Sequence, residues 1–350
     1  MSKARELANL GNAYSDGALS NRNLIINGDM RIAQRGTSFT VTNEYGLDRW
    51  FCRENTDGAL TFSQDSESPD GFSKSLKVNV DTADSSLSSS QFSYLGQRME
   101  GFTIERLGFG GSGAKKITLS FYVRCSVTGK FGGAMVNGSN NNRSFAFTYD
   151  VNSANTWERK TITIDGDTTG TWNIDNTQEA VLYWSLGAGS SVKKAEGSWD
   201  ATASIQSATE ATTELIENAS ATWFLTGVQL EIGDTATPFE HRSYGDELAR
   251  CQRYYEVGRL KTVAAVKTFS ATSTNDAAGW DWRVIKRAAP TVTIYSGTGT
   301  ADRISLYNSG TTEYVVSFVN NPDTNGVSSV VTTTNFERDV LFSWIAEAEI

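Results

Sequence analysis

The stretch KKITLSFYVRC (Lys115–Cys125) alternates apolar and polar side chains without a break. Successive side chains of a β-strand point to opposite faces, so this pattern predicts a strand with one buried face and one face toward water. Such strands are typical of antiparallel sheets. The buried face would carry Ile117, Leu119, Phe121, Val123 and Cys125, and the other face Thr118, Ser120, Tyr122 and Arg124.

The same period of two recurs on both sides of this stretch, in KSLKVNVD (74–81), RSFAFTYDV (143–151) and FLTGVQLEI (224–232). In the last of these, the pattern aligns Phe224, Thr226, Val228, Leu230 and Ile232 on one face. Turn signals such as Asn137–Gly138 and Asp165–Gly166 separate the strands. Many antiparallel strands within about 200 residues predict two sheets packed face to face, a sandwich of jelly-roll type.

A different pattern follows Pro238. Ser243 is a suitable N-cap for a helix, and Asp246 in the first turn suits the helix dipole. One helical stripe would then carry Tyr244, Leu248, Cys251 and Tyr255, spaced like a coiled-coil seam. Two interpretations stay open: the stripe packs on its own domain, or it faces copies of itself around a symmetry axis.

From Val257 onward the chain returns to short strands and Gly- and Asn-rich turns. We therefore expect an all-β protein with two antiparallel β-sandwich domains joined by a short amphipathic helix. The stretch 191–219 reads as a long ordered loop. The expected parts are an N-terminal docking or linker segment (1–22) with at most a short helix, a jelly-roll domain (23–235), a linker helix (236–256) and a C-terminal β-sandwich (257–350).

Composition excludes several classes of function. The net charge of −9 argues against binding to the phosphate backbone of nucleic acid. No apolar run approaches the roughly 18 residues that a membrane span needs, and the N-terminus lacks the apolar segment of a signal peptide. The three cysteines, Cys52, Cys125 and Cys251, follow no metal or redox spacing, and we expect reduced, partly buried thiols made in a cytosol.

Templates for catalysis fail on residue counts. His241 is the sole histidine, so His-based metal sites and catalytic triads lack their parts. GFGGSG (108–113) lacks the ending of a phosphate-binding loop and precedes a strand. Asp165, Asp167 and Asp175 suggest a calcium site, although turn aspartates explain them more simply. We expect no catalytic residue, no metal, no cofactor and no enzymatic activity.

Aromatic residues are the better candidates for ligand contacts, because sugars bind on flat aromatic faces beside polar groups. Trp157, Tyr183 and Trp184 lie in stretches that read as buried strands. Trp172 and Trp199 stand in polar surroundings and are the preferred candidates, followed by Trp280 and Trp282 in the second domain. The four tryptophans are the predicted carbohydrate-binding residues.

Three stretches in order, NLIINGDMRIAQRGTSFT with YGLDRW (23–50), NSANTWERKTITIDGDTTGTWN (152–173) and TGVQLEIGDTATPFEHRSYGDELARCQRYYE (226–256), resemble a family of bacteriophage tail-fibre and virion proteins of marine and cyanobacterial phages and prophages. The resemblance covers residues 23–256, and SKARELANLGN (2–12) is similar to the start of many phage tail proteins. In this family LDRW would be a core strand anchored by Trp50, and TGVQLEIG the last strand of the jelly roll.

The resemblance implies a carbohydrate-binding-module-like jelly roll in a homotrimeric virion appendage. Its expected partners are itself, other tail or baseplate proteins through the N-terminal segment, and a host surface glycan or receptor, without nucleic acid or membrane insertion. It would be made in the host cytoplasm and located in the virion. A glycan-degrading tail depolymerase and a capsid decoration or head-fibre protein remain the alternatives.

Overall fold

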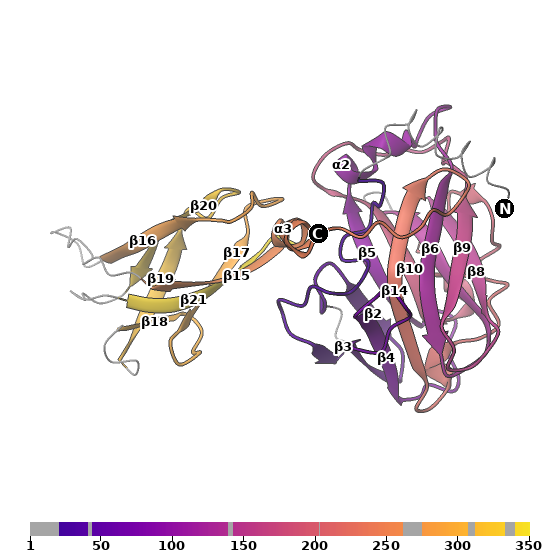
Figure 1. Ribbon diagram of the computed structural model, residues 1–350, viewed down its shortest axis with the longest axis horizontal. Helices are drawn as coiled ribbons and strands as arrows, with labels where there is room; N and C mark the ends of the chain where they lie inside the picture. The colour runs from indigo at the N-terminus through magenta and orange to yellow at the C-terminus, as the bar shows by residue number, and fades with distance from the viewer. Residues whose placement is uncertain are drawn as a thin grey trace. The chain divides into compact units, whose positions relative to one another are not determined.

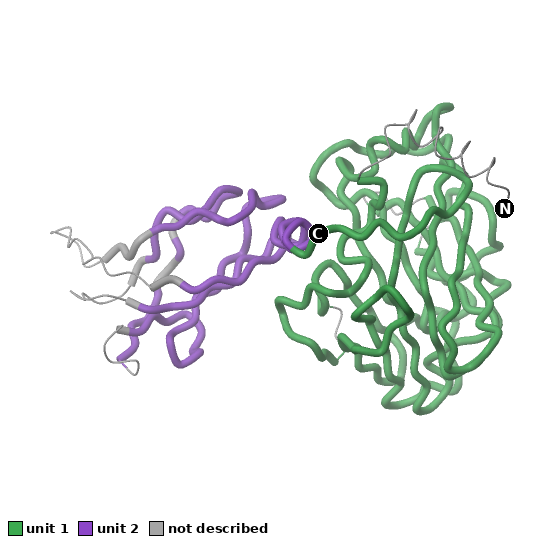
Figure 2. Tube along the Cα trace, in the orientation of Figure 1, with its two compact units in different colours: residues 1–244, 350 green, residues 245–349 purple. Residues whose placement is uncertain are grey.

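A computed structural model gives the structure of residues 21–40, 44–138, 143–202, 204–261, 275–306, 312–332 and 340–350. The chain divides into two compact units, residues 1–244 with 350 and residues 245–349 (Figure 2). The division falls within the predicted linker helix. The short helix expected at the N-terminus and residues 262–274 of the expected C-terminal β-sandwich lie outside the described residues.

Unit 1 consists of two six-stranded sheets in which every neighbouring pair is antiparallel (Figure 1). The first, sheet A, runs in the order β1 (Ser38–Thr40), β3 (Ala59–Asp65), β4 (Ser75–Thr82), β14 (Thr222–Ile232), β6 (Ile117–Cys125) and β9 (Glu158–Ile164). The second, sheet B, runs in the order β12 (Trp199–Asp200), β8 (Ser144–Val151), β7 (Gly129–Asn137), β10 (Gln178–Ala188), β5 (Phe92–Glu100) and β2 (Phe51–Asn55).

The two sheets pack face to face, as expected for a β-sandwich. Phe121 on sheet A contacts Trp184 and Tyr149 on sheet B, with ring centroids 5.5 and 5.3 Å apart. Trp223 donates a hydrogen bond from Nε1 to the Tyr149 hydroxyl across the core (3.2 Å). Burying each large apolar side chain stabilises the fold by about 1.5–3 kcal/mol. The predicted inward face of β6 is confirmed, because all five of its apolar side chains belong to this core.

The last strand, β14, departs from the predicted alternation. Its register shifts between Thr226 and Gln229, where Gly227 has a φ of +61°. This bulge switches the phase of the strand, so Leu225 joins the core while Phe224 lies outside it. The expected alignment of Phe224 with Val228 and Leu230 is therefore wrong. Phe224 instead lies between Lys77 and Arg124, whose charged groups are 5.4 and 5.0 Å from its ring centroid.

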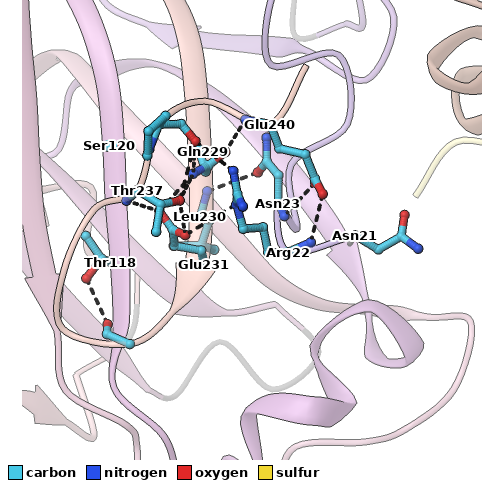
Figure 3. Close-up of polar contacts among 12 residues, drawn as sticks. Asn21, Arg22, Asn23, Thr118, Ser120, Gln229, Leu230, Glu231, Thr237 and Glu240 are labelled. Atoms are coloured by element: carbon cyan, nitrogen blue, oxygen red, sulfur yellow. Dashed lines mark hydrogen bonds and ion pairs between the residues drawn. The ribbon is translucent and has the colours of Figure 1, made fainter. Parts of the chain in front are cut away.

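Hydrogen bonds hold the segment that follows β14 against that strand (Figure 3). We call the residues that form these bonds the latch: Asn23, Gln229, Glu231, Thr237 and Glu240. The buried Glu231 carboxylate accepts hydrogen bonds from Thr237 N (2.8 Å), Thr237 Oγ1 (2.6 Å) and Gln229 Nε2 (2.8 Å). Glu240 accepts one from Asn23 N (3.0 Å), and Asn23 Oδ1 accepts one from Leu230 N (3.1 Å). The latch holds both chain ends of the sandwich at β14.

The stretches that resemble virion proteins supply these structural contacts. Trp50, fully buried just before β2, donates its Nε1 hydrogen to the backbone oxygen of Asn27 (2.9 Å). Asn27 has a φ of +56°. Its side-chain Nδ2 donates hydrogen bonds to the backbone oxygens of Ile32 and Asp48 (2.9 and 3.0 Å). These hydrogen bonds join NLIINGDM to YGLDRW. LDRW (47–50) is a turn before β2, so the expected core strand there is wrong, whereas β14 is the last strand of the sandwich as expected.

Shorter elements connect the strands of unit 1. The stretch 191–219 is a long excursion with three two-residue strands: β11 (Lys193–Lys194) pairs with β13 (Ser207–Ala208), and β12 pairs with β8. The remaining elements of this unit are α2 (Gly101–Ile104), η1 (Glu105–Leu107), η2 (Ser190–Val192) and η3 (Leu215–Glu217).

Unit 2 begins with most of the helix α3 (Tyr244–Gln252). The helix is shorter than expected, since Tyr255 already belongs to the first strand of the unit, β15. β21 pairs with β15, β17 and β18, while β19 links β18 to β20 and β16. The strands are β15 (Tyr255–Lys261), β16 (Asn275–Asp281), β17 (Thr291–Ser296), β18 (Arg303–Leu306), β19 (Glu313–Asn320), β20 (Gly326–Thr332) and β21 (Val340–Glu347).

The fold class is confirmed: the chain is all-β, with antiparallel β-sandwich units and a short helix at their junction. Among the described residues, no helix combines the length and the hydropathy that crossing a bilayer requires.

Candidate functional site

Sheet B carries aromatic side chains on the face turned away from the core. On β5, Leu95 and Met99 point inward, so the alternate residues Phe92, Tyr94 and Arg98 point outward. These outward aromatics belong to a second buried cluster, distinct from the one between the sheets, which also contains apolar side chains of β7, β8 and β10 and of the stretch 191–219. We call this region the outer aromatic face and define it by Phe51 on β2, Phe92 and Tyr94 on β5, Tyr183 on β10, and the two arginines Arg53 and Arg98.

Strand register brings these residues together. Gly96 on β5 pairs with Phe51 on one side and with Tyr183 on the other. A Cβ atom at Gly96 would lie 2.7 Å from the Leu182 backbone oxygen, 3.0 Å from Tyr183 Cδ1 and 3.1 Å from Phe51 Cζ. Glycine at this position therefore leaves the space into which the two rings extend.

The rings contact one another across the three strands. Tyr94 and Tyr183 have ring centroids 4.2 Å apart, and Phe92 stacks on Tyr94 at 5.6 Å. Phe51 meets Tyr94 and Tyr183 edge to face, at 5.9 and 6.4 Å. Phe51 and Tyr94 are buried, whereas Phe92 and Tyr183 are half-buried. The rings are thus fixed by packing, and two of them keep surface that a ligand could cover.

An arginine lies over an aromatic ring at two places on the face. The guanidinium carbon of Arg98 is 4.4 Å from the Phe51 ring centroid, and that of Arg53 is 5.9 Å from the Phe92 ring centroid. Such contacts orient the guanidinium groups while leaving their N–H donors available. Arg53 is exposed, and Arg98 is half-buried. Arg98 also donates to the backbone oxygen of Ile350, which groups with unit 1.

The two tyrosine hydroxyls stay protonated. Burial raises the pKa of Tyr94, and the positive charge of Arg53 and the contact with Tyr183 offset part of that rise. Burial raises the pKa of Tyr183 well above its usual value, and the charge of Tyr94 adds to the rise. Both phenols therefore stay neutral at pH 7. The Tyr183 hydroxyl hydrogen-bonds to that of Tyr94, which leaves the pair one O–H donor for a ligand oxygen.

The excursion 191–219 covers the other half of the same sheet face. A Cβ atom at Gly132 on β7 would lie 2.1 Å from Ser207 Oγ and 2.9 Å from Ala211 Cβ. Ile205 and Ala208 of the excursion are buried in the cluster on the outer face of β7 and β8. The outer aromatic face is therefore limited to β2, β5 and β10.

Trp172 and Trp199, predicted to bind carbohydrate, lie together at one end of the sandwich. Their ring centroids are 5.6 Å apart, and both rings meet Phe109 edge to face. Trp172 donates from Nε1 to Asp167 Oδ2 (3.1 Å), and Trp199 donates to the Asp165 backbone oxygen (2.6 Å). Both are half-buried against the core. Sugar contact there stays a prediction.

Trp280 and Trp282 belong to the core cluster of unit 2. Trp280 stacks on Trp344 with centroids 5.5 Å apart, and Trp282 meets Trp344 at 5.1 Å. Trp282 is 7% exposed and donates from Nε1 to the Asp323 backbone oxygen (2.8 Å). Trp280 is half-buried. Their role in carbohydrate binding also stays a prediction.

The predicted oligomer contact residues do not form one helical stripe, because the helix ends at Gln252. Tyr244 is 56% exposed and Leu248 is half-buried, whereas Cys251 and Tyr255 are buried within the single chain. Tyr244 and Leu248 are thus the members of this set that keep surface for a second copy.

The three aspartates considered for calcium have separate partners. Asp165 forms an exposed ion pair with Lys116 (2.6 Å). Asp167 accepts hydrogen bonds from Arg143, and Asp175 accepts them from Thr177. Within the described ranges, no group of three or more His, Cys, Asp or Glu residues is arranged to hold a metal ion.

Sequence reasoning missed most of the outer aromatic face. Tyr183 was considered among the aromatic candidates, but the stretch around it reads as a buried strand. The signal that was available is the alternation in FSYLGQRME (92–100), where aromatic residues and an arginine share the face opposite Leu95 and Met99. The alternation shows that the aromatic residues share one face of the strand. It does not show whether the second sheet packs on that face or on the opposite one.

No protein-family model matches the chain, and no curated protein matches it. Among solved structures, it is similar to the enzymatically active domain of bacteriophage CBA120 tailspike protein 4 (11% identity, 61% of this chain, 22% of that chain, TM-score 0.33). It is also similar to TmCBM61 in complex with β-1,4-galactotriose (9% identity, 61% of this chain, 100% of that chain, TM-score 0.32). A third is the family 11 carbohydrate-binding module from Clostridium thermocellum in complex with a β-1,3-1,4-mixed-linked tetrasaccharide (10% identity, 59% of this chain, 100% of that chain, TM-score 0.31).

The chain thus spans less than a quarter of the tailspike structure that it matches. Likenesses at this level assign neither a function nor a ligand, so the function has to be argued from the chain's own residues.

Proposed function

We propose that this protein binds a glycan on the outer aromatic face. The observation that carries the proposal is a packed array of rings on the outside of a sheet, with Tyr183 and Phe92 keeping accessible ring surface. Aromatic faces bind the C–H faces of sugar rings, and neighbouring phenol and guanidinium groups donate hydrogen bonds to sugar oxygens. The hydrogen-bonded pair of Tyr94 and Tyr183 hydroxyls has one O–H left to donate, and the exposed Arg53 guanidinium provides further donors.

The biological setting follows from the sequence resemblance to phage virion proteins. We propose a structural component of a virion, most simply a homotrimeric tail fibre that recognises a glycan on the host surface. The N-terminal segment 1–22 would dock on other tail or baseplate proteins. A role in capsid decoration or in a head fibre fits the same residues, and imaging of the assembled particle with a labelled N-terminus separates these locations.

Binding of glycans by the purified chain is the direct test. A glycan array should give ligands, and calorimetry with one of them should show that Phe92→Ala combined with Tyr183→Ala removes binding. Phe102→Ala is the matched control, because it removes an exposed aromatic ring (56%) that lies outside the outer aromatic face. A ligand whose affinity is unchanged in the double variant would place its site elsewhere.

Catalysis and oligomerisation have their own tests. Release of reducing sugars from host polysaccharide would overturn the proposal of binding without catalysis and favour a depolymerase. Light scattering should give the mass of three chains at micromolar concentration, and Leu248→Asp should lower that mass. A monomer in the unmodified protein would contradict the trimer.

A further inference from the structure

The outer aromatic face concentrates positive charge in an acidic chain. The whole protein has a net charge of −9, yet the residues that point outward from β2 and β5 include Arg53 and Arg98. Glu100 and Glu179, at the Arg98 end of these strands, are 2% and 0% exposed. Glu179 is bonded to Asn137 and Asn173. At the Arg53 end, Glu54 is half-buried, and the exposed Asp57 accepts a hydrogen bond from Gln91 Nε2 (3.1 Å). Among the side chains that point outward from β2 and β5, the charged groups that keep exposed surface are therefore the guanidinium groups of Arg53 and Arg98.

Both guanidinium groups act on the same two hydroxyls. The charges of Arg53 and Arg98 each lower the pKa of Tyr94, and each lowers the pKa of Tyr183, against the larger rise that burial causes. Arg53 and Tyr94 are also direct cross-strand partners in the pairing of β2 with β5. Two cations and the one O–H donor that the hydrogen-bonded tyrosine pair leaves available thus lie in one region, and such donors suit an oxyanion.

Arg53 is the cation that a ligand can reach. It is exposed, and no carboxylate among the described residues pairs with it, whereas Arg98 is half-buried and already bonded to Ile350. Its contact with the ring of Phe92, at 5.9 Å, places a positive charge beside an accessible aromatic surface. A sugar ring lying on Phe92 and Tyr183 would bring its substituents next to this guanidinium.

We propose that the glycan recognised by the outer aromatic face is an acidic one, whose carboxylate pairs with Arg53 while its ring lies on Phe92 and Tyr183. This inference rests on the proposed function. The planar guanidinium matches a carboxylate in a bidentate arrangement, and the Tyr94 hydroxyl, on the residue paired with Arg53, supplies a further donor. Uronic acids and sialic acids are the sugars that carry such a group.

Calorimetry on the full chain tests the inference with matched probes. The acidic probes are oligogalacturonate, oligoalginate and sialyllactose, and the neutral counterparts are methyl-esterified oligogalacturonate and lactose. At least one acidic probe should bind about tenfold or more tightly than its neutral counterpart, and raising the salt from about 50 to about 300 mM should weaken that binding because exposed charges are screened.

Variants assign the effect to one residue. Arg53→Gln should abolish the preference for the acidic probe, and Arg53→Lys should restore part of it. Arg124→Gln is the matched control, because Arg124 also lies over a ring (Phe224, 5.0 Å) but on the outer face of the opposite sheet. It should leave both affinity and preference unchanged.

The possible failures are distinguishable. Suppose that acidic and neutral probes bind equally, that Tyr183→Ala removes the binding and that Arg53→Gln leaves it unchanged. That result would overturn the acidic ligand but keep the proposal of glycan binding. The acidic ligand would also be overturned if the acidic probe still bound to Tyr183→Ala, or if Arg124→Gln weakened its binding as much as Arg53→Gln does. In either case the attraction between charges would not depend on the outer aromatic face. Absence of binding to every glycan would remove both proposals.

Discussion

The rings of Tyr94 and Tyr183 lie 4.2 Å apart, centroid to centroid, on adjacent strands and on the side of the sheet that faces away from the core. Tyr183→Ala should weaken glycan binding about tenfold, because an aromatic contact contributes about 0.5–1.5 kcal/mol. Tyr183→Phe should retain most of the affinity if stacking dominates. Isothermal titration calorimetry measures both, and an unchanged far-ultraviolet circular dichroism spectrum is the control for folding. Full affinity in Tyr183→Ala would exclude the ring from the site.

Gly96 should be indispensable to this arrangement. Gly96→Ala places a Cβ atom 2.7 Å from the Leu182 backbone oxygen, so the strands must shift, and we expect a loss of about 1–3 kcal/mol in the free energy of unfolding. Gly111→Ala, where nothing lies within 4 Å of the added atom, is the matched control. Urea unfolding followed by tryptophan fluorescence compares the two. Equal stability in both variants would contradict the close packing at Gly96.

The latch should contribute to the stability of the sandwich. Glu231→Ala removes the acceptor for Thr237 and Gln229 at a buried position, and we expect a loss of about 2–4 kcal/mol in the free energy of unfolding. Asp165→Ala breaks an ion pair whose partners are both 60% exposed, and it should change stability by less than about 0.5 kcal/mol. Differential scanning calorimetry should rank the variants in that order. A larger loss of stability in Asp165→Ala than in Glu231→Ala would contradict the stabilising role of the latch.

Glu158 should make stability depend on pH in acid. Burial alone would raise its pKa, but hydrogen bonds from Lys160, Ser153 N and Asn152 lower the pKa from 4.5 to about 2. A carboxyl group with a depressed folded-state pKa stabilises the fold above its unfolded pKa and loses that contribution as the pH falls from about 4.5 to about 2. The contribution should be about 1–2 kcal/mol, allowing for solvent screening.

Urea midpoints at pH 7, 4.5 and 3 check this. The unmodified protein should lose more stability on acidification than Glu158→Gln, which cannot ionise. Parallel losses in both proteins would show that Glu158 does not contribute to the pH dependence.

Strict alternation predicted the class of fold well. In β6 every second residue from Ile117 to Cys125 belongs to the core, as the alternation predicts. The expectation that the other face meets water is wrong for Thr118 and Ser120, which are also buried. The prediction failed on β14, where the bulge at Gly227 switches the phase and moves Phe224 out of the core. A single glycine within a strand is only a weak indication of a bulge. The sequence therefore did not predict that the residues before Gly227 point to the opposite face from the one that the alternation assigns them.

The site was less predictable than the fold, for a related reason. Trp172 and Trp199 stand in polar sequence, yet they pack on each other, because the loop before β10 that carries Trp172 meets the edge strand β12 that carries Trp199. Phe92 and Tyr183 stand in strand sequence, yet they lie outside the core. The polarity of the sequence around a residue describes only its neighbours along the chain. Whether a ligand can reach the residue depends on which face of the sheet the rest of the protein covers.

The most direct test of the account is a structure of the full chain with a bound glycan from the array. We predict that the sugar lies across Phe92 and Tyr183 on the outer face of sheet B, within hydrogen-bonding distance of Arg53. A glycan bound at Trp172 and Trp199, or at Trp280 and Trp282, would contradict it.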